Sequence, residues 1–275
     1  MKKISLLALC LVLVMSFAGC NTGDTGKKFE DMTAYEHYVA VNEKSNELES
    51  LEMTYSGKAS IGMPDMGVNM DMDFSGNSKQ VIHSESDQDM NIDMTISAMG
   101  ENIAMQMYYI DGVMYQNDGT NKVKYAMELA DATEQAGLAN SLNAMAFMEE
   151  SVLSANMEDA EGGKKLIFEL DPVMIGDMLS GIIDPMLASF EAEDMTMDVA
   201  INALTYEMVI DTEHNLKDMR MILSMDVDVA MQEMGSMTMT CDMDMSYTIV
   251  STNTVTEIVL PDDPDSYTLM DSAGL

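Results

Sequence analysis

The chain has 275 residues, enough for one large domain or two small ones, and a formal net charge of −35, from 48 acidic and 13 basic residues. A chain this acidic repels nucleic acid and anionic lipid headgroups, which excludes functions that depend on binding either of them through charge. It contains 34 methionines and no tryptophan, and methionine is a flexible apolar residue that fills irregular or adaptable apolar surfaces.

The first 19 residues have the order of parts of an export signal. Two lysines precede an apolar run over residues 4–17, which is too short to span a bilayer comfortably. The tetrad Phe17-Ala18-Gly19-Cys20 resembles a lipobox, the motif at which bacterial lipoproteins are diacylated on cysteine and then cleaved before it. We therefore expect a signal peptide over residues 1–19 and a lipidated Cys20. The alternative is an ordinary secretory leader with Cys20 as a plain thiol.

Residues 20–30 are expected to be the lipidated cysteine and a flexible polar tether. This arrangement predicts a protein anchored by lipid to the extracytoplasmic face of the cell membrane, since the acidic chain offers no other membrane contact. Removal of residues 1–19 takes away two lysines, so the formal charge becomes −37. Cys10 would leave with the leader and Cys20 would be acylated, so Cys241 would have no partner for an internal disulfide. Residues 31–275 are predicted to form a single domain, expected to be monomeric.

The first helix signal is the capping box of Thr33 and Glu36, followed by apolar residues at helical spacing, which predicts a helix from about Thr33 to Ser50. The apolar period then changes to two, which predicts strands with one wet face and one apolar face. These strands are expected at residues 51–61, 68–74, 90–98 and 103–109. Turns are predicted at Gly62–Gly67, Ser75-Gly76-Asn77, Gly100, Asp111-Gly112 and Asn117–Gly119.

The middle of the chain has helical spacing. Apolar residues from Leu138 to Val152 recur at intervals of four, three, three and four, which predicts a helix that continues until Gly162-Gly163. A short strand is expected at Lys165–Leu170. Asp171-Pro172 and Asp184-Pro185 each place an N-cap acceptor before a proline at the first helical position, so each predicts a short helix.

The second half returns to strands, and these are long. Residues 219–231 and 237–249 each alternate seven apolar residues without a break, which corresponds to a strand of roughly 43 Å. The apolar phase changes between residues 195–201 and 204–210, which predicts a bulge near Ala203. A last strand is expected from Thr254 to Leu260.

Many amphipathic antiparallel strands with few helices predict an α+β fold. The expected form is one long curved antiparallel sheet, an unclosed half-barrel, with helices packed on its concave face. Aspartate and threonine would then face water, and the methionines would line the inside.

Several local patterns carry a family resemblance. The segment Tyr108–Tyr115 leads to Lys122-Val123-Lys124, a strand ends in Asp171-Pro172, a hairpin surrounds His214-Asn215, and Val255–Pro261 is expected to close the sheet. Over about residues 33 to 262 the chain resembles the LolA and LppX/LprG superfamily of bacterial envelope lipoproteins and lipoprotein carriers, and within it the methionine-rich lipoproteins of Gram-positive bacteria. The resemblance implies a half-barrel wrapped over helices, a hydrophobic-ligand site between them, and no catalytic residues.

Motifs of enzymes are absent from the sequence, which holds no G-x-S-x-G, H-E-x-x-H or P-loop. His37, His83 and His214 lie far apart in sequence, and each is interpreted as a surface or turn residue. The segment Asp71–Gly76 matches the opening of a calcium loop, but Ile82 stands where a bidentate glutamate is needed. We therefore expect no enzymatic activity, no cofactor and no metal site.

The predicted function is binding of a lipid or other hydrophobic molecule between sheet and helices. The expected lining residues are Met70, Met72, Met94, Met105, Met107, Met221, Leu223, Met225, Met239, Met243 and Met245. One alternative is a closed methionine-rich core without ligand, whose acidic surface meets an envelope partner. Another is a Cu(I) site, because five sulfurs at alternate positions from Met237 to Met245 suit that ion, although neighbours on one strand face are nearly 7 Å apart.

Overall fold

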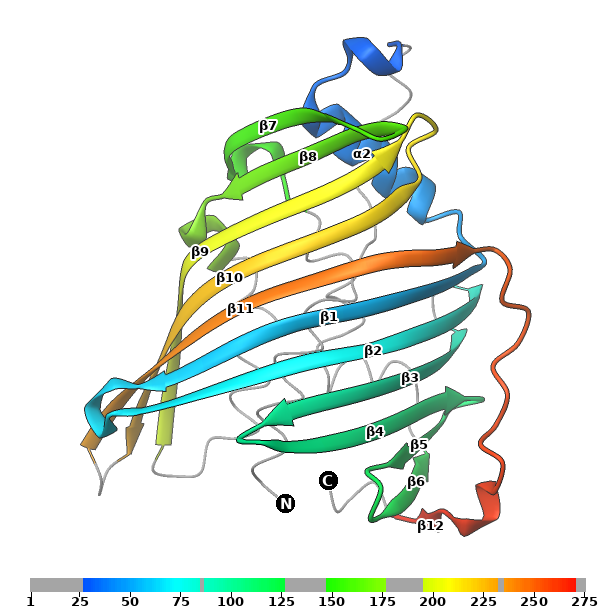
Figure 1. Cartoon of the computed structure of the whole chain (residues 1–275), viewed down its shortest axis with the longest axis vertical. Helices are drawn as coiled ribbons and strands as arrows, with labels where there is room; N and C mark the ends of the chain where they lie inside the picture. The colour runs from blue at the N-terminus through cyan, green and yellow to red at the C-terminus, as the bar shows by residue number, and fades with distance from the viewer. Residues whose placement is uncertain (1–26, 85–86, 127–146, 177–194, 232–234, 271–275) are drawn as a thin grey trace.

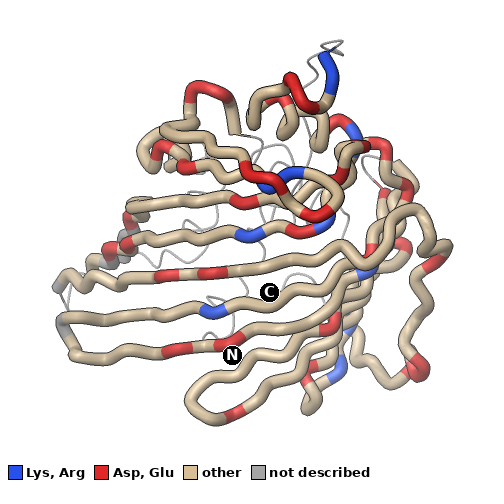
Figure 2. The backbone as a smooth tube through the Cα atoms, turned by 45° about the horizontal axis from the view of Figure 1, so that its top comes forward, with Lys and Arg blue, Asp and Glu red and all other residues tan. Residues whose placement is uncertain are grey.

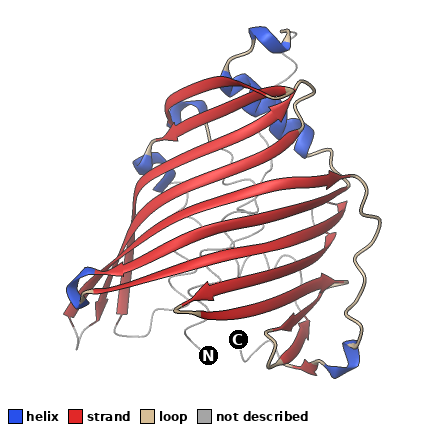
Figure 3. Cartoon of the chain, viewed as in Figure 1, coloured by secondary structure: helices blue, strands red, loops and turns tan. Residues whose placement is uncertain are grey.

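The computed structural model describes residues 27–84, 87–126, 147–176, 195–231 and 235–270. In this part of the chain twelve strands form one sheet, in the order β12-β6-β5-β4-β3-β2-β1-β11-β10-β9-β8-β7 (Figure 1). Adjacent strands are antiparallel except for β12, which is parallel to β6. The sheet is long and curved and its two edges do not meet (Figure 3). The predicted α+β class with an unclosed antiparallel sheet is confirmed.

The strands follow the expected alternation of apolar and polar residues closely. The larger strands are β1 (Ser50–Met63), β2 (Val68–Ser84), β3 (Asp87–Ala98), β4 (Glu101–Ile110), β9 (Met195–Asp211), β10 (Leu216–Met231) and β11 (Gly235–Thr252). The shorter ones are β5 (Val113–Asn117), β6 (Lys122–Ala126), β7 (Val152–Ala160), β8 (Gly163–Leu170) and β12 (Thr268–Leu269). Single helical turns are η1 (Phe29–Asp31), η2 (Pro64–Met66), η3 (Glu149–Ser151) and η4 (Pro264–Ser266).

Helix α2 (Ala34–Ser45) begins at the predicted capping box. The Thr33 side chain accepts a hydrogen bond from the Glu36 backbone N at 3.2 Å, and the Glu36 carboxylate accepts one from the Thr33 backbone N at 2.8 Å. The helix ends five residues before the expected end at Ser50, because Ser50 already belongs to β1. Its backbone O accepts a hydrogen bond from Asn253 N at 2.9 Å, so pairing with a distant segment stops the helix.

The turn predicted at Ser75-Gly76-Asn77 is wrong, because these residues lie inside β2. Gly76 pairs with Tyr55 of β1 and with Met94 of β3. A Cβ atom on Gly76 would lie 2.5 Å from the Tyr55 hydroxyl oxygen. Glycine is therefore required here for the close approach of a tyrosine side chain, a role that glycine also has within strands.

The helix predicted to continue to Gly162-Gly163 is also wrong in its described part, since residues 152–160 form β7. This strand pairs with β8 through a tight turn in which Gly162 has φ +76°. Pairing with β8 makes residues 152–160 a strand, and the helical spacing of their apolar residues does not reveal this pairing. The rest of the predicted helix, residues 138–146, lies outside the described residues.

The Asp171 cap is confirmed. Its Oδ1 accepts hydrogen bonds from the backbone N of Val173 at 2.9 Å and of Met174 at 3.2 Å, and residues 172–176 are helical. The cap predicted at Asp184-Pro185 lies outside the described residues, as do the leader, Cys20 and the tether up to residue 26.

The predicted bulge in β9 is confirmed within one residue. Ala203 pairs with Ser224 and Ile201 pairs with Met225, so Asn202 is the extra residue. The bulge allows both halves of β9 to turn their apolar residues to the same side of the sheet.

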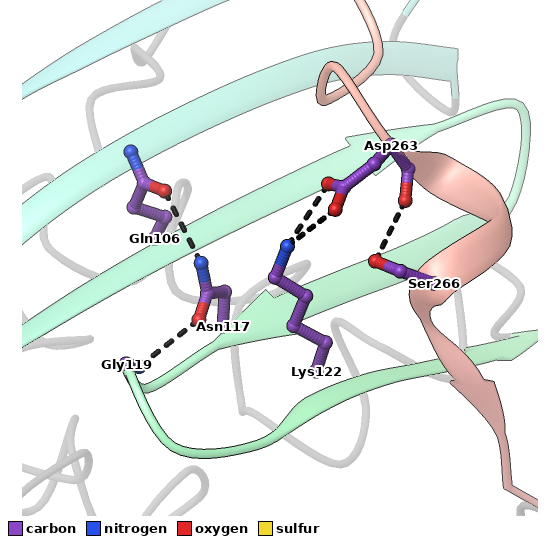
Figure 4. Close-up of polar contacts among 6 residues, drawn as sticks. All are labelled: Gln106, Asn117, Gly119, Lys122, Asp263 and Ser266. Carbon is purple, nitrogen blue, oxygen red and sulfur yellow. Dashed lines mark hydrogen bonds and ion pairs between the residues drawn. The ribbon is translucent and has the colours of Figure 1, made fainter.

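The strand predicted at Thr254–Leu260 is wrong, because this segment forms no ladder. Asn253 has φ +56° and turns the chain away from β11. Residues 253–267, here called the C-terminal strap, run past the neighbouring strands to β6, where β12 pairs (Figure 1). The Lys122 ammonium is 2.7 Å from the Asp263 carboxylate and fixes the far end of the strap (Figure 4).

Candidate functional site

One side of the sheet, here called the apolar face, carries cross-strand rows of apolar side chains. In each row, the strand register places every residue directly opposite the next one on the neighbouring strand. The central row is Met105, Met94, Gly76, Tyr55, Tyr247, Met219, Met208 and Leu166. A second row is Ile103, Ile96, Phe74, Gly57, Met245, Met221, Tyr206 and Phe168, and a third is Ala98, Met72, Ala59, Met243, Leu223, Leu204 and Leu170. The rows cross eight or seven strands, so the face is one continuous apolar surface.

All eleven predicted lining residues lie at strand positions that point to the apolar face. Seven are buried, namely Met72, Met94, Met105, Met221, Leu223, Met243 and Met245. Met70, Met107, Met225 and Met239 are half-buried. The structure thus brings these residues to one surface, and their contact with a ligand stays a prediction.

Aromatic residues of the face were missed in the predicted lining. Tyr55, Phe74, Tyr206 and Tyr247 are buried on it, and Phe168 is fully buried beside them. The same alternation that selects the methionines includes these positions, so the period of two could have found them.

One end of the apolar face is closed by an aromatic cluster. Tyr38 of α2 stacks on Phe147 with ring centroids 4.0 Å apart, and Phe147 lies 5.1 Å from Phe168 of β8 and 5.9 Å from Tyr206 of β9. The Tyr38 hydroxyl accepts a hydrogen bond from the Phe147 backbone N at 3.1 Å. Helix α2 contacts β7 and β8. The cluster therefore fills the space between the helix and this end of the sheet.

The opposite end of the face is less covered. Five of its residues are half-buried, and we call them the distal apolar end: Met70, Ile201, Met225, Val227 and Met239. Ile61 and Cys241, which lie between Met70 and Met225 in the register, are buried. They lie toward the β1–β2 hairpin and the matching ends of β9 to β11 (Figure 1). Beyond them the hairpin exposes Met66 and Val68, at 56% and 45%. Burial thus decreases along the face from α2 toward this hairpin.

The apolar face has almost no charge. Inward positions within residues 51–61, 70–78, 90–98, 199–210, 219–227 and 237–249 hold no Asp, Glu, Lys, Arg or His. Burial raises the pKa of Tyr55, of Tyr206 and of Tyr247 above the ordinary phenol value, so all three stay neutral. The Tyr55 hydroxyl donates to the Asp93 backbone O at 3.2 Å. Polar groups on this face are therefore neutral.

The charged residues within these six strand segments all occupy outward positions, on the outer face of the sheet. Figure 2 marks them along the strands. Arg220 lies 2.7 Å from Asp244 on β11 and 3.7 Å from Glu207 on β9, and Lys165 of β8 lies 3.1 Å from the same Glu207. Arg220 lowers the pKa of Asp244 below its usual range through paired hydrogen bonds. Such exposed pairs contribute only about 0–1 kcal/mol each to stability.

Two histidines interpreted as separate surface or turn residues are in contact. His37 of α2 is fully buried, and its Nδ1 lies 3.0 Å from Nε2 of His214 in the β9–β10 turn. The Phe29 ring lies 4.5 Å from the His37 ring and 5.2 Å from the His214 ring. The interpretation of His37 as a surface residue is wrong. No local sequence pattern could reveal its burial or its contact with His214. His214 does lie in a turn, with φ +61°.

The described residues hold no group of three or more His, Cys, Asp or Glu side chains that could bind a metal ion. Of the sulfur series on β11, Met243 and Met245 are buried in the rows described above, and Cys241 is buried on the same face. The Cu(I) alternative stays untested by these contacts. Among the helices of the described segments, none is long and apolar enough to cross a membrane.

Comparison with known proteins gives a family and several distant folds. The sequence matches, over residues 33–264, a family described as a family of unknown function, DUF6612. No curated protein matches the chain. The structure is similar to LprF from Mycobacterium bovis at 12% identity and a TM-score of 0.44, covering 84% of this chain and 98% of LprF.

Two further solved structures are more distant. The ywiB protein from Bacillus subtilis is 7% identical with a TM-score of 0.24, covering 76% of this chain and 99% of its own. A DUF1329 family protein from Desulfovibrio piger is 11% identical with a TM-score of 0.26, covering 84% and 94%. Because these TM-scores lie below 0.5, function has to be inferred from the geometry of the sheet.

Proposed function

The chain belongs to the DUF6612 family, and we propose that it is a lipid-anchored extracytoplasmic lipoprotein that binds a lipid or other hydrophobic molecule against its apolar face. It would act by binding and not by catalysis. The membership in the LolA and LppX/LprG superfamily suggested by the sequence is part of this proposal. The lipobox-like tetrad ending in Cys20 supports the anchor.

The observation that carries the binding function is the decrease in burial along one continuous apolar face. At the α2 end, Met221 and Met208 are 1% and 0% exposed, whereas the five residues of the distal apolar end are half-buried. Apolar surface left in water is unfavourable by about 25 cal/mol per Å². An apolar ligand that covers the distal end would remove this cost.

Methionine suits such a surface. Its unbranched side chain has three rotatable bonds and a polarizable sulfur, so it can repack around ligands of different shape. Met70, Met225 and Met239 come from three different strands and share the distal apolar end. We therefore propose a ligand site there that tolerates variation in the apolar chain.

Native mass spectrometry tests the proposal on protein purified from cells. A chain that starts at Asn21 keeps every described element, and we expect it to carry noncovalent adducts of lipid mass. Met225→Asp should lose these adducts, because it places a charge on the distal apolar end. Ala200→Asp is the matched control, since Ala200 is exposed on the outer face and pairs with Asp226. Adducts retained equally in both variants would contradict the proposed site.

A closed methionine-rich core without ligand is the second candidate. The observation that favours it is the near-complete burial of most predicted lining residues, including Met72 at 2% and Met245 at 2%. This candidate predicts a bare protein mass, both as purified and after incubation with a lipid extract. The acidic outer face would then be the functional surface.

A further inference from the structure

We infer that the ligand of the apolar face is a neutral lipid and that the site discriminates against anionic amphiphiles such as free fatty acids. This inference rests on the proposed binding function and names the chemical class of its ligand. It follows from where the structure places charge relative to the apolar face.

The first argument concerns the interior. A carboxylate drawn onto the apolar face would need a cation or several hydrogen-bond donors, because burial of an unpaired charge is strongly unfavourable. The inward positions of the six strand segments named above offer no cation. The Tyr55 hydroxyl is already used on the Asp93 backbone O. An uncharged ester or hydroxyl group has no such requirement.

The second argument concerns five of the eleven cations that the structure describes. Lys58, Lys79, Lys165 and Arg220 lie on the outer face, paired with carboxylates at 2.7 to 3.7 Å. Lys164 has inward register, but it lies at the closed end and is held by Asp159 at 2.7 Å and Glu30 at 3.2 Å. None of these five is placed at the distal apolar end to receive an anion.

The third argument is the field of the whole chain. A formal charge of −35 produces a negative potential that lowers the local concentration of anions. An anionic amphiphile is therefore disfavoured on approach and again on burial. Salt screens the first effect, since the Debye length is about 10 Å at 0.1 M, but it does not supply a partner for a buried charge.

The test compares three probes with the same saturated acyl chain: a monoacylglycerol, the fatty acid and the alkylamine. Each displaces an uncharged fluorescent naphthylamine dye from the chain starting at Asn21, after circular dichroism has confirmed a folded sheet. At slightly alkaline pH we expect the monoacylglycerol to bind at least about tenfold more tightly than the fatty acid, a difference of about 1.4 kcal/mol. The difference should shrink in high salt without vanishing.

Paired variants separate the interior from the general field. Met225→Lys adds a cation at the distal apolar end and should raise fatty-acid affinity relative to monoacylglycerol. Ala200→Lys adds the same charge to the exposed outer face and should leave the ratio nearly unchanged. Equal effects of the two variants would overturn the inference.

The outcomes also distinguish this inference from the proposed function. If the fatty acid binds as tightly as the monoacylglycerol, the ligand class is wrong and the binding function stands. If neither dye nor probe binds, the binding function itself is wrong and the inference falls with it. The alkylamine separates the two effects, because the negative field attracts its ammonium on approach while burial of that charge stays unfavourable.

Discussion

At the scale of single residues, the contact between His37 and His214 makes the stability of the fold depend on pH. With one proton shared between Nδ1 of His37 and Nε2 of His214, one ring donates and the other accepts. The His37 Nε2 atom is buried and has no hydrogen-bond partner among the described residues. Protonation of both rings would place two donors face to face, so the contact requires that at least one of the two rings is neutral.

Burial lowers the pKa of His37 and of His214 below the ordinary value of about 6.5. Lys164 acts on His37 and Lys44 on His214 in the same direction, while Glu30 and Asp211 oppose them. Because both folded-state pKa values are depressed, the unfolded chain binds more protons below about pH 6.5. The stability from this pair is present above that pH and is lost as the pH falls toward the folded pKa values.

Urea unfolding between pH 7.5 and 5 checks this sign. We expect the free energy of unfolding to fall with pH, by at most about 1.4 kcal/mol per pH unit for each proton taken up. His37→Gln should reduce this slope. His83→Gln is the control, because the hydrogen bond to Asp89 raises the pKa of exposed His83, and its contribution is lost as pH rises instead. An unchanged slope in His37→Gln would show that the pair does not titrate with folding.

At the scale of elements, the junction between β11 and the C-terminal strap depends on Asn253. Its Oδ1 accepts hydrogen bonds from the backbone N of Glu49 at 2.8 Å and of Ser50 at 3.3 Å. The Ser50 hydroxyl in turn accepts one from Val255 N at 3.1 Å. One side chain therefore joins the start of β1 to the start of the strap.

Substitutions at Asn253 should separate its role as a residue with positive φ from its role as a hydrogen-bond acceptor. Asn253→Gly keeps access to the positive φ of 56° but loses the acceptor, and Asn253→Ala loses both. We expect the unfolding free energy to fall by about 1–3 kcal/mol in Asn253→Ala and by less in Asn253→Gly. Asn253→Asp, which keeps an acceptor, should stay nearest to the native value. Thermal or urea unfolding measures this order of stability. A glycine variant that is less stable than the alanine variant would refute it.

Local sequence predicted the elements well where a short pattern was sufficient. The Thr33 cap, the turn at Asp111-Gly112 with φ +50° and +74°, and the β9 bulge were all predicted. The failures were the supposed turn at Gly76, the strand β7 and the strap. For Gly76 and the strap, pairing with another part of the chain sets the conformation, and for β7 the hairpin partner β8 does.

At the scale of the whole molecule, the anchor on Cys20 is the prediction that determines where the protein acts. We expect the native chain to partition into detergent and to yield an N-terminal cysteine bearing lipid, which mass spectrometry of the first peptide detects. Cys20→Ser should move the protein to the aqueous phase. Cys241→Ser is the control, since Cys241 is buried in β11 and far from the expected anchor in sequence. Native protein with a free Cys20 thiol would instead support the ordinary secretory leader.

The division into residues 1–19, 20–30 and 31–275 likewise stays a prediction. The twelve described strands belong to one sheet, which is the arrangement a single domain needs. The acidic outer face and the neutral apolar face follow from the same alternation, because successive side chains of a strand point to opposite sides.

The sequence alone determined which residues share a side of the sheet, where α2 begins and where β9 shifts its phase, because these depend on neighbours a few positions apart. It therefore identified eleven residues that share the apolar face, although the buried Met53, Met208 and Met219 of the same face were not among them. Only the tertiary structure decided that Gly76 makes room for Tyr55, that His37 meets His214 across 177 positions, and that the strap crosses to β6. These contacts join residues whose separation in the chain leaves no local pattern, so they arise only when the sheet assembles.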